Sequence, residues 1–301
     1  MSREYGIDPE AINTYETFFQ VIPHFGSRHF RYIRRYPKKW SSMVKRAVDN
    51  IAPRAKARII EKLIQIDKEL VDCLSDHNGN PTYNGTISWF DNANSFHSIQ
   101  PFDGIITSTT NGCSYVCDIY SLDIDTNPIF KPPYRVRRTA DEMASIAKQL
   151  LQHAREIHFV DPHFEKLNQR HFRPLKKFLE TIFARIGNTP ISKIIYHTGN
   201  LIQDDAGIKA AFDKRIIPIL PAGASVSFVR WPYDQMHNRF ILTDIGGIGF
   251  GIGLDDDDLG SNPNHFDDVY PISLDTCLEK DCGGICFMNN TQPVFHSVTG
   301  Q

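Results

Sequence analysis

The chain has 301 residues, 41% of them hydrophobic and 23% charged, so it can bury one large core or two smaller ones. Its apolar stretches are far shorter than the roughly 20 residues that a membrane-spanning helix needs. The N-terminus lacks the apolar core of an export signal, and we expect the six cysteines to be reduced thiols. A net charge of −2 argues against a chain that coats nucleic acid over its whole surface. We therefore expect a globular protein of the cytoplasm with no membrane span.

The charges are distributed unevenly along the chain. Residues 1–70 carry 14 Lys and Arg against 8 Asp and Glu, whereas residues 245–301 carry one lysine against 9 acidic residues. The basic end is also aromatic between residues 28 and 40, a pattern typical of surfaces that bind nucleic acid. The candidate contacts there are Arg31, Arg34 and Arg35. A solvated element whose rings pack into the core would give the same pattern, so both interpretations stand.

Residues 1–135 form a first region, which we expect to be α+β and to recognise a protein partner or nucleic acid. A short helix should follow Pro9, and a helical stretch from about 42 to 74 should be divided by Pro53. Strand-like runs lie around residues 86–90, 104–108 and 115–122. The Pro-rich residues 126–133 resemble a linker.

Residues 136–301 form a second region, in which strands and helices alternate. A capping box at Thr139–Glu142 opens a helix, and Phe172–Phe183 has helical spacing, as does a shorter run near 208–212. The sequence predicts a mixed sheet flanked by helices. Its expected strands are 157–160, 193–196, 225–230 and 240–243.

The most informative motif is His237-x-Arg239-x4-Asp244, with Asn238 between the histidine and the arginine. Alternate residues of an extended segment point to the same side, so His237 and Arg239 should face one site. Asp244 follows the apolar strand and would join them if the next turn folds back. An imidazole can act as a nucleophile or an acid near neutral pH, and a guanidinium binds phosphate through two hydrogen bonds.

This motif resembles the His-x-Lys-x4-Asp motif of the phospholipase D superfamily, with arginine in place of lysine. The glycine-rich run up to Gly253 fits the strand pair of that superfamily, and Asp161-Pro162-His163-Phe164 resembles the end of its first strand. The resemblance covers roughly residues 136–260. This region is similar to the PLD-like domain at the C-terminus of MIT-domain proteins and to bacterial relatives of that domain.

The resemblance implies a phosphodiesterase that works without a cofactor or a metal. His237 would attack phosphorus, Arg239 would hold the phosphate oxygens and Asp244 would orient a histidine. Side chains around them would contact the substrate, namely Asn238, Asp161, His163 and Glu165. The basic N-terminal region favours nucleic acid as substrate. A nuclease effector of a bacterial defence system is the role that the resemblance implies.

Two departures from the family pattern carry consequences. Members of the family use two motif histidines, and this chain has one full motif, so we expect a homodimer or larger oligomer that pairs two copies of His237. Arg239 keeps the positive charge, but relatives with arginine include domains that bind phosphate groups. The alternative function is therefore an inactive PLD-like module that binds phosphate on nucleic acid, a lipid headgroup or a protein.

Other polar residues suggest weaker alternatives. The cysteines at 113, 117, 277, 282 and 286 lack the two-residue spacing of zinc knuckles, so we expect no metal there. Asp255–Asp258, with Asp267 and Asp268, could hold a divalent cation, but a solvated acidic loop fits better. His197, at the end of a strand, is expected to be structural.

Overall fold

A computed structural model describes residues 3–72, 82–109, 112–131, 134–164, 168–185, 190–257, 265–278, 286–289 and 292–301. The chain divides into two compact units, Ser2–Pro132 and Pro133–Gln301, close to the boundary expected at residue 135. Each unit has its own sheet. Within the described residues, no helix has the length and apolar character needed to cross a membrane.

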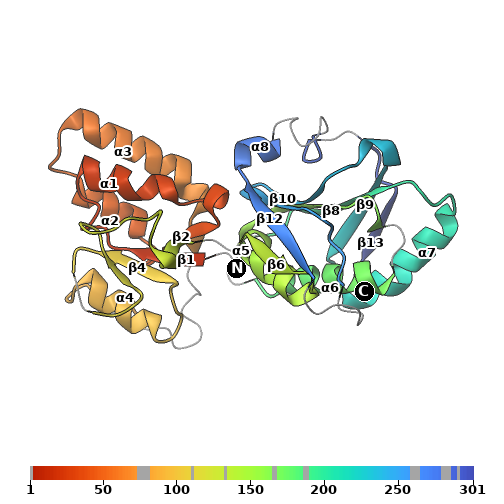
Figure 1. The fold of residues 1–301 in the computed structure, drawn as a ribbon, viewed down its shortest axis with the longest axis horizontal. Coiled ribbons are helices and arrows are strands. Elements are labelled where there is room, and N and C mark those ends of the chain that lie inside the picture. The colour runs from red at the N-terminus through yellow and green to blue at the C-terminus, as the bar shows by residue number, and fades with distance from the viewer. Residues whose placement is uncertain are drawn as a thin grey trace. The chain divides into compact units, whose positions relative to one another are not determined.

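The N-terminal unit is built on a five-stranded sheet with the order β3-β2-β1-β4-β5, all neighbours being parallel (Figure 1). Its strands are β1 (Arg3–Ile7), β2 (Arg31–Arg35), β3 (Val71–Asp72), β4 (Gly104–Thr107) and β5 (Val116–Asp118). Its helices are α1 (Tyr15–Val21), α2 (Trp40–Ala47), α3 (Pro53–Ile66) and α4 (Trp89–His97).

Helices cover both faces of this sheet. Helices α1, α2 and α3 lie on one face, where their apolar side chains share a core with Tyr5 of β1 and Ile33 of β2 (Figure 1). Helix α4 covers the other face through Trp89 and Phe96. Strands buried on both faces are expected in parallel sheets, and the alternation of strands and helices explains why four of the five residues of β2 are buried.

The N-terminal unit is more regular than the α+β region that the sequence predicts. The sequence does not predict strands β1 and β2, because their glycine, arginines and tyrosines do not alternate between polar and apolar types. The strand expected at 86–90 is wrong, since α4 begins at Trp89. Ser88 caps this helix by accepting a hydrogen bond from the amide of Asp91, and apolar residues then follow at helical spacing.

The Pro-rich segment expected to be a linker belongs to the N-terminal unit up to residue 131. Phe130 is fully buried and stacks on Tyr5, with ring centroids 4.9 Å apart. The carbonyl of Ile129 accepts a hydrogen bond of 2.7 Å from the Tyr5 hydroxyl. This segment is therefore packed against the sheet rather than extended between the two units.

The C-terminal unit contains an eight-stranded mixed sheet with the order β13-β9-β8-β7-β10-β11-β12-β6. Its strands are β6 (Arg135–Arg137), β7 (Glu156–Val160), β8 (Lys193–Gly199), β9 (Ser225–Trp231), β10 (Arg239–Thr243), β11 (Gly246–Phe250), β12 (Phe266–Ile272) and β13 (His296–Thr299). Its helices are α5 (Ala140–His153), α6 (Gln169–Phe183), α7 (Asp205–Ile216) and α8 (Leu274–Leu278).

The predicted class, a mixed sheet flanked by helices, is confirmed. Thr139 caps α5 as expected, by accepting a hydrogen bond from the amide of Glu142. Helices α6 and α7 pack their phenylalanines on one face of the sheet, as the contacts of Phe178 with Phe159 and of Phe212 with Phe228 show. Helix α8 lies over the other face (Figure 1).

The strand directions determine where polar side chains gather. Strands β7, β8 and β9 are parallel, and β10 runs antiparallel to β7. The carboxyl ends of the three parallel strands therefore lie at the same edge of the sheet as the start of β10. Open α/β sheets bind ligands beyond the carboxyl ends of their parallel strands. We call this region the carboxyl edge.

Candidate functional site

Arg239, the first residue of β10, holds its guanidinium group at the carboxyl edge between the two candidate histidines. Its Nη1 donates a hydrogen bond of 2.8 Å to the main-chain carbonyl of His237. Its Nη2 lies 3.3 Å from Nε2 of His163, the residue that follows β7 by three positions. Arginine only donates hydrogen bonds, so Nε2 of His163 accepts this one and a neutral ring carries its proton on Nδ1.

Asp161 fixes the loop that presents His163. One carboxylate oxygen accepts a hydrogen bond of 2.8 Å from the amide of His163, and the other accepts one of 2.8 Å from the amide of Leu254. The carboxylate is almost fully buried and thereby ties the end of β7 to the loop after β11. Asp161 thus orients the site from beneath and does not face solvent.

The register of β7 and β10 explains why the two histidines are neighbours of one arginine. Phe240 pairs with Val160 as the outermost pair of this antiparallel ladder. His237 precedes that pair by three residues and His163 follows it by three, so both lie beyond the same end of the ladder. Sequence spacing alone cannot give this relation, because it depends on which two strands are adjacent.

Polar atoms of the site lack partners in the described part of the chain. Arg239 Nε and His163 Nδ1 are buried and form no hydrogen bond there. The His237 side chain is exposed, and no described residue bonds to its imidazole. An unpartnered Nε of a permanent cation, together with an unpartnered nitrogen of the adjacent histidine ring, favours an anion with several acceptor oxygens, such as a phosphate.

Asp244 lies at the opposite end of β10 from Arg239, roughly 15 Å away at the usual rise per residue of a strand. Its Oδ1 accepts hydrogen bonds from the main-chain amides of Arg155 (2.9 Å) and Glu156 (3.2 Å). The expectation that the next turn returns Asp244 to His237 is therefore wrong. The turn instead leads directly into β11, and the carboxylate fastens the start of β7.

Two further residues, Asn238 and Glu165, are expected to contact the substrate near the motif. Asn238 is partly exposed between His237 and Arg239 and is available to a ligand. Glu165 lies outside the described residues.

The arginines of the basic aromatic segment are part of the N-terminal sheet. Arg31 is 7% exposed and donates to the carbonyl of Phe130 at 2.7 Å, while Arg34 is 4% exposed and pairs with Glu4. Arg35 pairs with Asp67, which precedes β3, and with Asp72, the last residue of β3. These contacts stabilise the sheet, which corrects the expectation that the three side chains bind a substrate. The alternative interpretation, in which the rings enter the core, agrees with Tyr32, Tyr36 and Trp40, all nearly fully buried.

The described part of the acidic run is neither solvated nor arranged around a cation. Asp255 pairs with Arg138 and, at 2.7 Å, with Arg170, and Asp256 lies 3.3 Å from Arg173. These pairs hold the loop after β11 against α6. Asp258 lies outside the described residues. Nearby, Asp267 is buried, and burial raises the pKa of its carboxyl although main-chain amides donate to it; Asp268, by contrast, is exposed beside Arg135.

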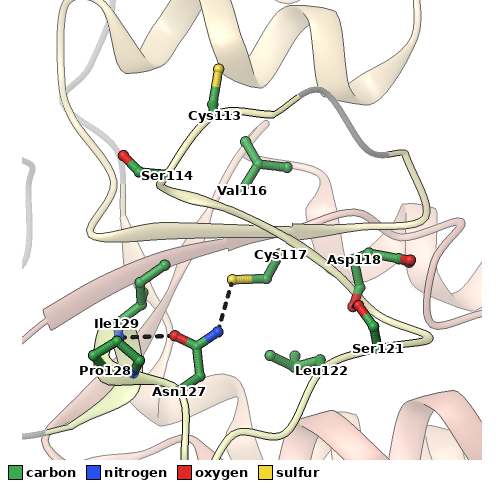
Figure 2. Close-up of a pocket in the computed structure, with 10 residues that line it drawn as sticks. All are labelled: Cys113, Ser114, Val116, Cys117, Asp118, Ser121, Leu122, Asn127, Pro128 and Ile129. Carbon is green, nitrogen blue, oxygen red and sulfur yellow. Dashed lines mark hydrogen bonds between the residues drawn. The ribbon is translucent and has the colours of Figure 1, made fainter.

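No group of three or more His, Cys, Asp or Glu side chains within the described ranges is arranged to hold a metal ion. An open cavity of about 440 Å³ beside β5 includes Cys113 and Cys117 among its lining residues (Figure 2). The two thiols point to different sides of the strand, and that of Cys117 lies 3.7 Å from Nδ2 of Asn127 (Figure 2). Burial raises the pKa of the Cys117 thiol, so it is a poor nucleophile. Cys282 lies outside the described residues.

A series of side-chain hydrogen bonds crosses the sheet beneath the carboxyl edge. Of its members, the sequence draws attention only to His197. The indole of Trp231 donates to Nδ1 of His197 (3.0 Å), whose Nε2 lies 2.8 Å from Nδ1 of His158. Nε2 of His158 in turn lies 2.9 Å from Glu156. Indole is only a donor, so both neutral rings carry their proton on Nε2 and donate toward Glu156.

The pKa shifts of these hydrogen-bonded residues agree with neutral histidine rings. Burial lowers the pKa of His158, and that of His197 lies well below its ordinary value for the same reason. The hydrogen bond from His158, helped by Lys193, lowers the pKa of Glu156 to about 2. His197 is thus structural, as expected. The alternating pattern of β7 hides the role of His158, because its partners come from other strands.

Comparisons with known proteins identify no family. No family model matches the chain, and no curated protein matches it. Among solved structures, TrmBL2, an archaeal chromatin protein described as showing a novel mode of DNA binding, is similar at a TM-score of 0.23 and 12% sequence identity. The match covers 48% of this chain and 47% of that one. A similarity at this TM-score supports no statement about the fold or the function of this chain.

Proposed function

We propose that the C-terminal unit is a PLD-like phosphodiesterase that cleaves nucleic acid in the cytoplasm through a phosphohistidine, without a metal. The observation that carries the proposal is the guanidinium of Arg239, held at the carboxyl edge between the main chain of His237 and the ring of His163. The His237 side chain is exposed, and its main chain is bonded to this cation. Nucleophilic attack on a phosphodiester requires an accessible imidazole and a cation that holds the phosphate.

The reaction takes two steps. A lone pair of the His237 ring forms a bond to phosphorus, the bond from phosphorus to the leaving oxygen breaks, and a second histidine gives that oxygen a proton. The second histidine then takes a proton from water, whose oxygen displaces His237 from phosphorus. Arg239 neutralises the non-bridging oxygens in both steps.

His163 is the candidate for the second histidine within one chain. The sequence favours a homodimer that pairs two copies of His237, yet His163 already contacts the same guanidinium. To donate a proton, His163 must first become an imidazolium, so its Nε2 must leave the Arg239 guanidinium when the phosphate binds there. A site completed in this way needs no partner subunit. A role as an effector of a bacterial defence system remains part of the proposal by analogy with single-motif relatives.

The test is a cleavage assay on single- and double-stranded DNA and RNA in EDTA, with wild type and His237→Ala. We expect cleavage in EDTA that falls at least 100-fold in the variant, since general acid–base and nucleophilic steps each contribute factors of about 10² or more. Cleavage that requires added metal would contradict the mechanism. Binding without cleavage, weakened by Arg239→Ala, would instead support the phosphate-binding module.

The same assay locates the second histidine. If His163 acts in the same chain, His163→Gln and His237→Ala are each inactive, and mixing the two variants restores nothing. If the site is shared between subunits, mixing restores part of the activity. A fully active His163→Gln would exclude His163 and favour the paired His237 residues.

A further inference from the structure

An exposed aromatic ring stands beside the Arg239 site. Tyr233 follows β9, and 37% of its surface is exposed. Its ring centroid is 5.6 Å from that of His163, whose Nε2 contacts Arg239. The order β9-β8-β7-β10 places the ring, His163 and the guanidinium along one sheet edge. The edge from β9 to β10 spans about 14 Å at the usual distance between strands.

The turn that presents this ring is anchored at both ends. The amide of Tyr233 donates to Oδ1 of Asn200 (3.1 Å), and its carbonyl accepts from the amide of Met236 (3.1 Å). Met236 is 3% exposed and belongs to the core beneath the sheet edge. Because the backbone that carries the ring is already ordered, binding a ligand against it costs little conformational entropy.

Gly199, at the end of β8, makes room for the ring. A Cβ at this position would lie 2.9 Å from Cδ2 of Tyr233 and 2.8 Å from the carbonyl oxygen of Pro162. Neither contact is possible for a real side chain without a shift of the ring or the main chain. The absence of a side chain at position 199 therefore lets the ring lie close to the strand end, next to His163.

We propose that Tyr233 stacks on a base of single-stranded nucleic acid whose neighbouring phosphate is held by Arg239. This inference rests on the proposed function and specifies its substrate. An exposed ring next to a cation is the usual device for holding unpaired bases, since every base offers a flat face. In a duplex these faces are covered by neighbouring base pairs, so the site discriminates against double strands. A lipid headgroup gives the ring nothing to stack on.

Fluorescence anisotropy with labelled 12-nucleotide DNA tests the proposal. All proteins carry His237→Ala so that the probe stays intact, and both single-stranded and duplex probes are used. We expect Tyr233→Ala to weaken single-strand binding about tenfold, the size typical of one base stack, and Tyr233→Phe to keep it. The matched control is Tyr120→Ala, which removes a 75% exposed tyrosine of the N-terminal unit and should change nothing.

A probe of abasic residues, which keeps the phosphates and lacks the bases, separates stacking from other effects. Tyr233→Ala should bind this probe as well as the protein with Tyr233 does. Equal losses on both probes, or no loss on the single strand, would overturn the stacking role. Tighter binding to duplex, or Tyr233-dependent binding only to vesicles of phosphatidylglycerol and phosphatidylcholine, would overturn the substrate class.

Failure of the underlying function has a different signature. If Arg239→Ala binds every probe as tightly as its parent, the phosphate site itself is wrong, and the stacking role falls with it. If Arg239→Ala weakens binding while Tyr233→Ala does not, the phosphate site stands and only the role of Tyr233 is overturned.

Discussion

Two segments of the molecule combine rings with cations, and the structure uses them in opposite ways. Residues 28–40 of the N-terminal unit place most of their rings and two of their arginines inside a parallel sheet. Residues 231–239 of the C-terminal unit lie at the carboxyl edge, where Tyr233 and His237 are exposed and Arg239 is half-buried. The same residue types are therefore buried in the core in one segment and lie at the edge of a sheet in the other.

The difference follows from hydrogen bonding and charge. Inside the sheet, Arg34 meets the carboxylate of Glu4 and the carbonyl of Gln100, and its guanidinium lies 4.8 Å from the centre of the Phe102 ring. At the carboxyl edge, the hydrogen bonds of Arg239 within the described residues go to neutral acceptors, and no described carboxylate forms an ion pair with it. A cation without a counter-charge attracts an anion, whereas a paired cation does not.

The largest expected effect is a loss of stability at acidic pH, caused by the buried histidines. Burial lowers the pKa of five histidines, that of His29 to about 4, while their ordinary value is 6.5; the five are His29, His97, His158, His171 and His197. The unfolded chain takes up protons that the folded one refuses, so stability is intact above pH 6.5 and falls as the pH drops toward 4. For the most deeply buried of them, His158 and His197, each excluded proton costs up to about 1.4 kcal/mol per pH unit, and for the more exposed ones it costs less.

Urea unfolding at a series of pH values measures this slope. The control is His237→Gln, which removes an exposed histidine and should leave the slope unchanged. A stability that is flat between pH 6.5 and 5 would contradict the neutral, tautomerically fixed state of the His158–His197 pair.

The second largest effect is expected from a comparison of Arg34 with Arg239. Arg34→Ala removes the ion pair with Glu4 inside the sheet, and breaking a buried ion pair lowers the free energy of unfolding by about 3 kcal/mol. Arg239→Ala should change it by only about 0.5 kcal/mol and should weaken oligonucleotide binding instead. Urea unfolding and anisotropy on both variants give the comparison. Equal destabilisation, or a loss of binding in a folded Arg34→Ala, would erase the distinction between the two segments.

The sequence predicts elements well where a single pattern decides them. Helices α3, α5 and α6 show apolar residues at helical spacing, and strands β7 to β10 are compact apolar runs. The sequence does not predict strand β2, because Arg34 is neutralised by Glu4 and Arg35 by Asp67 and Asp72, which are distant in sequence. Burial of a charge depends on such partners, and a local pattern contains no information about them.

Most residues of the candidate site can be named from the sequence, but their arrangement in space cannot be predicted from it. The motif names His237 and Arg239, and the end of β7 names His163, but their relation requires the pairing of β7 with β10. Tyr233 carried a local signal, a Trp-Pro-Tyr run just before the motif that makes a turn after a strand. The position of its ring beside His163 depends on Gly199 of β8, a relation that no local pattern reveals.

The smallest expected effect concerns the two ends of β10. Asp244→Ala removes the acceptor of two main-chain amides at the start of β7, which should lower the free energy of unfolding by about 1 kcal/mol. Asp244→Asn keeps an acceptor oxygen and should recover most of this loss. Neither change should alter oligonucleotide binding or cleavage, because the side chain lies at the far end of the strand from Arg239. A folded Asp244→Ala that loses cleavage 100-fold would show instead that the motif acts as a catalytic unit over the length of the strand, as the resemblance to the phospholipase D superfamily implies.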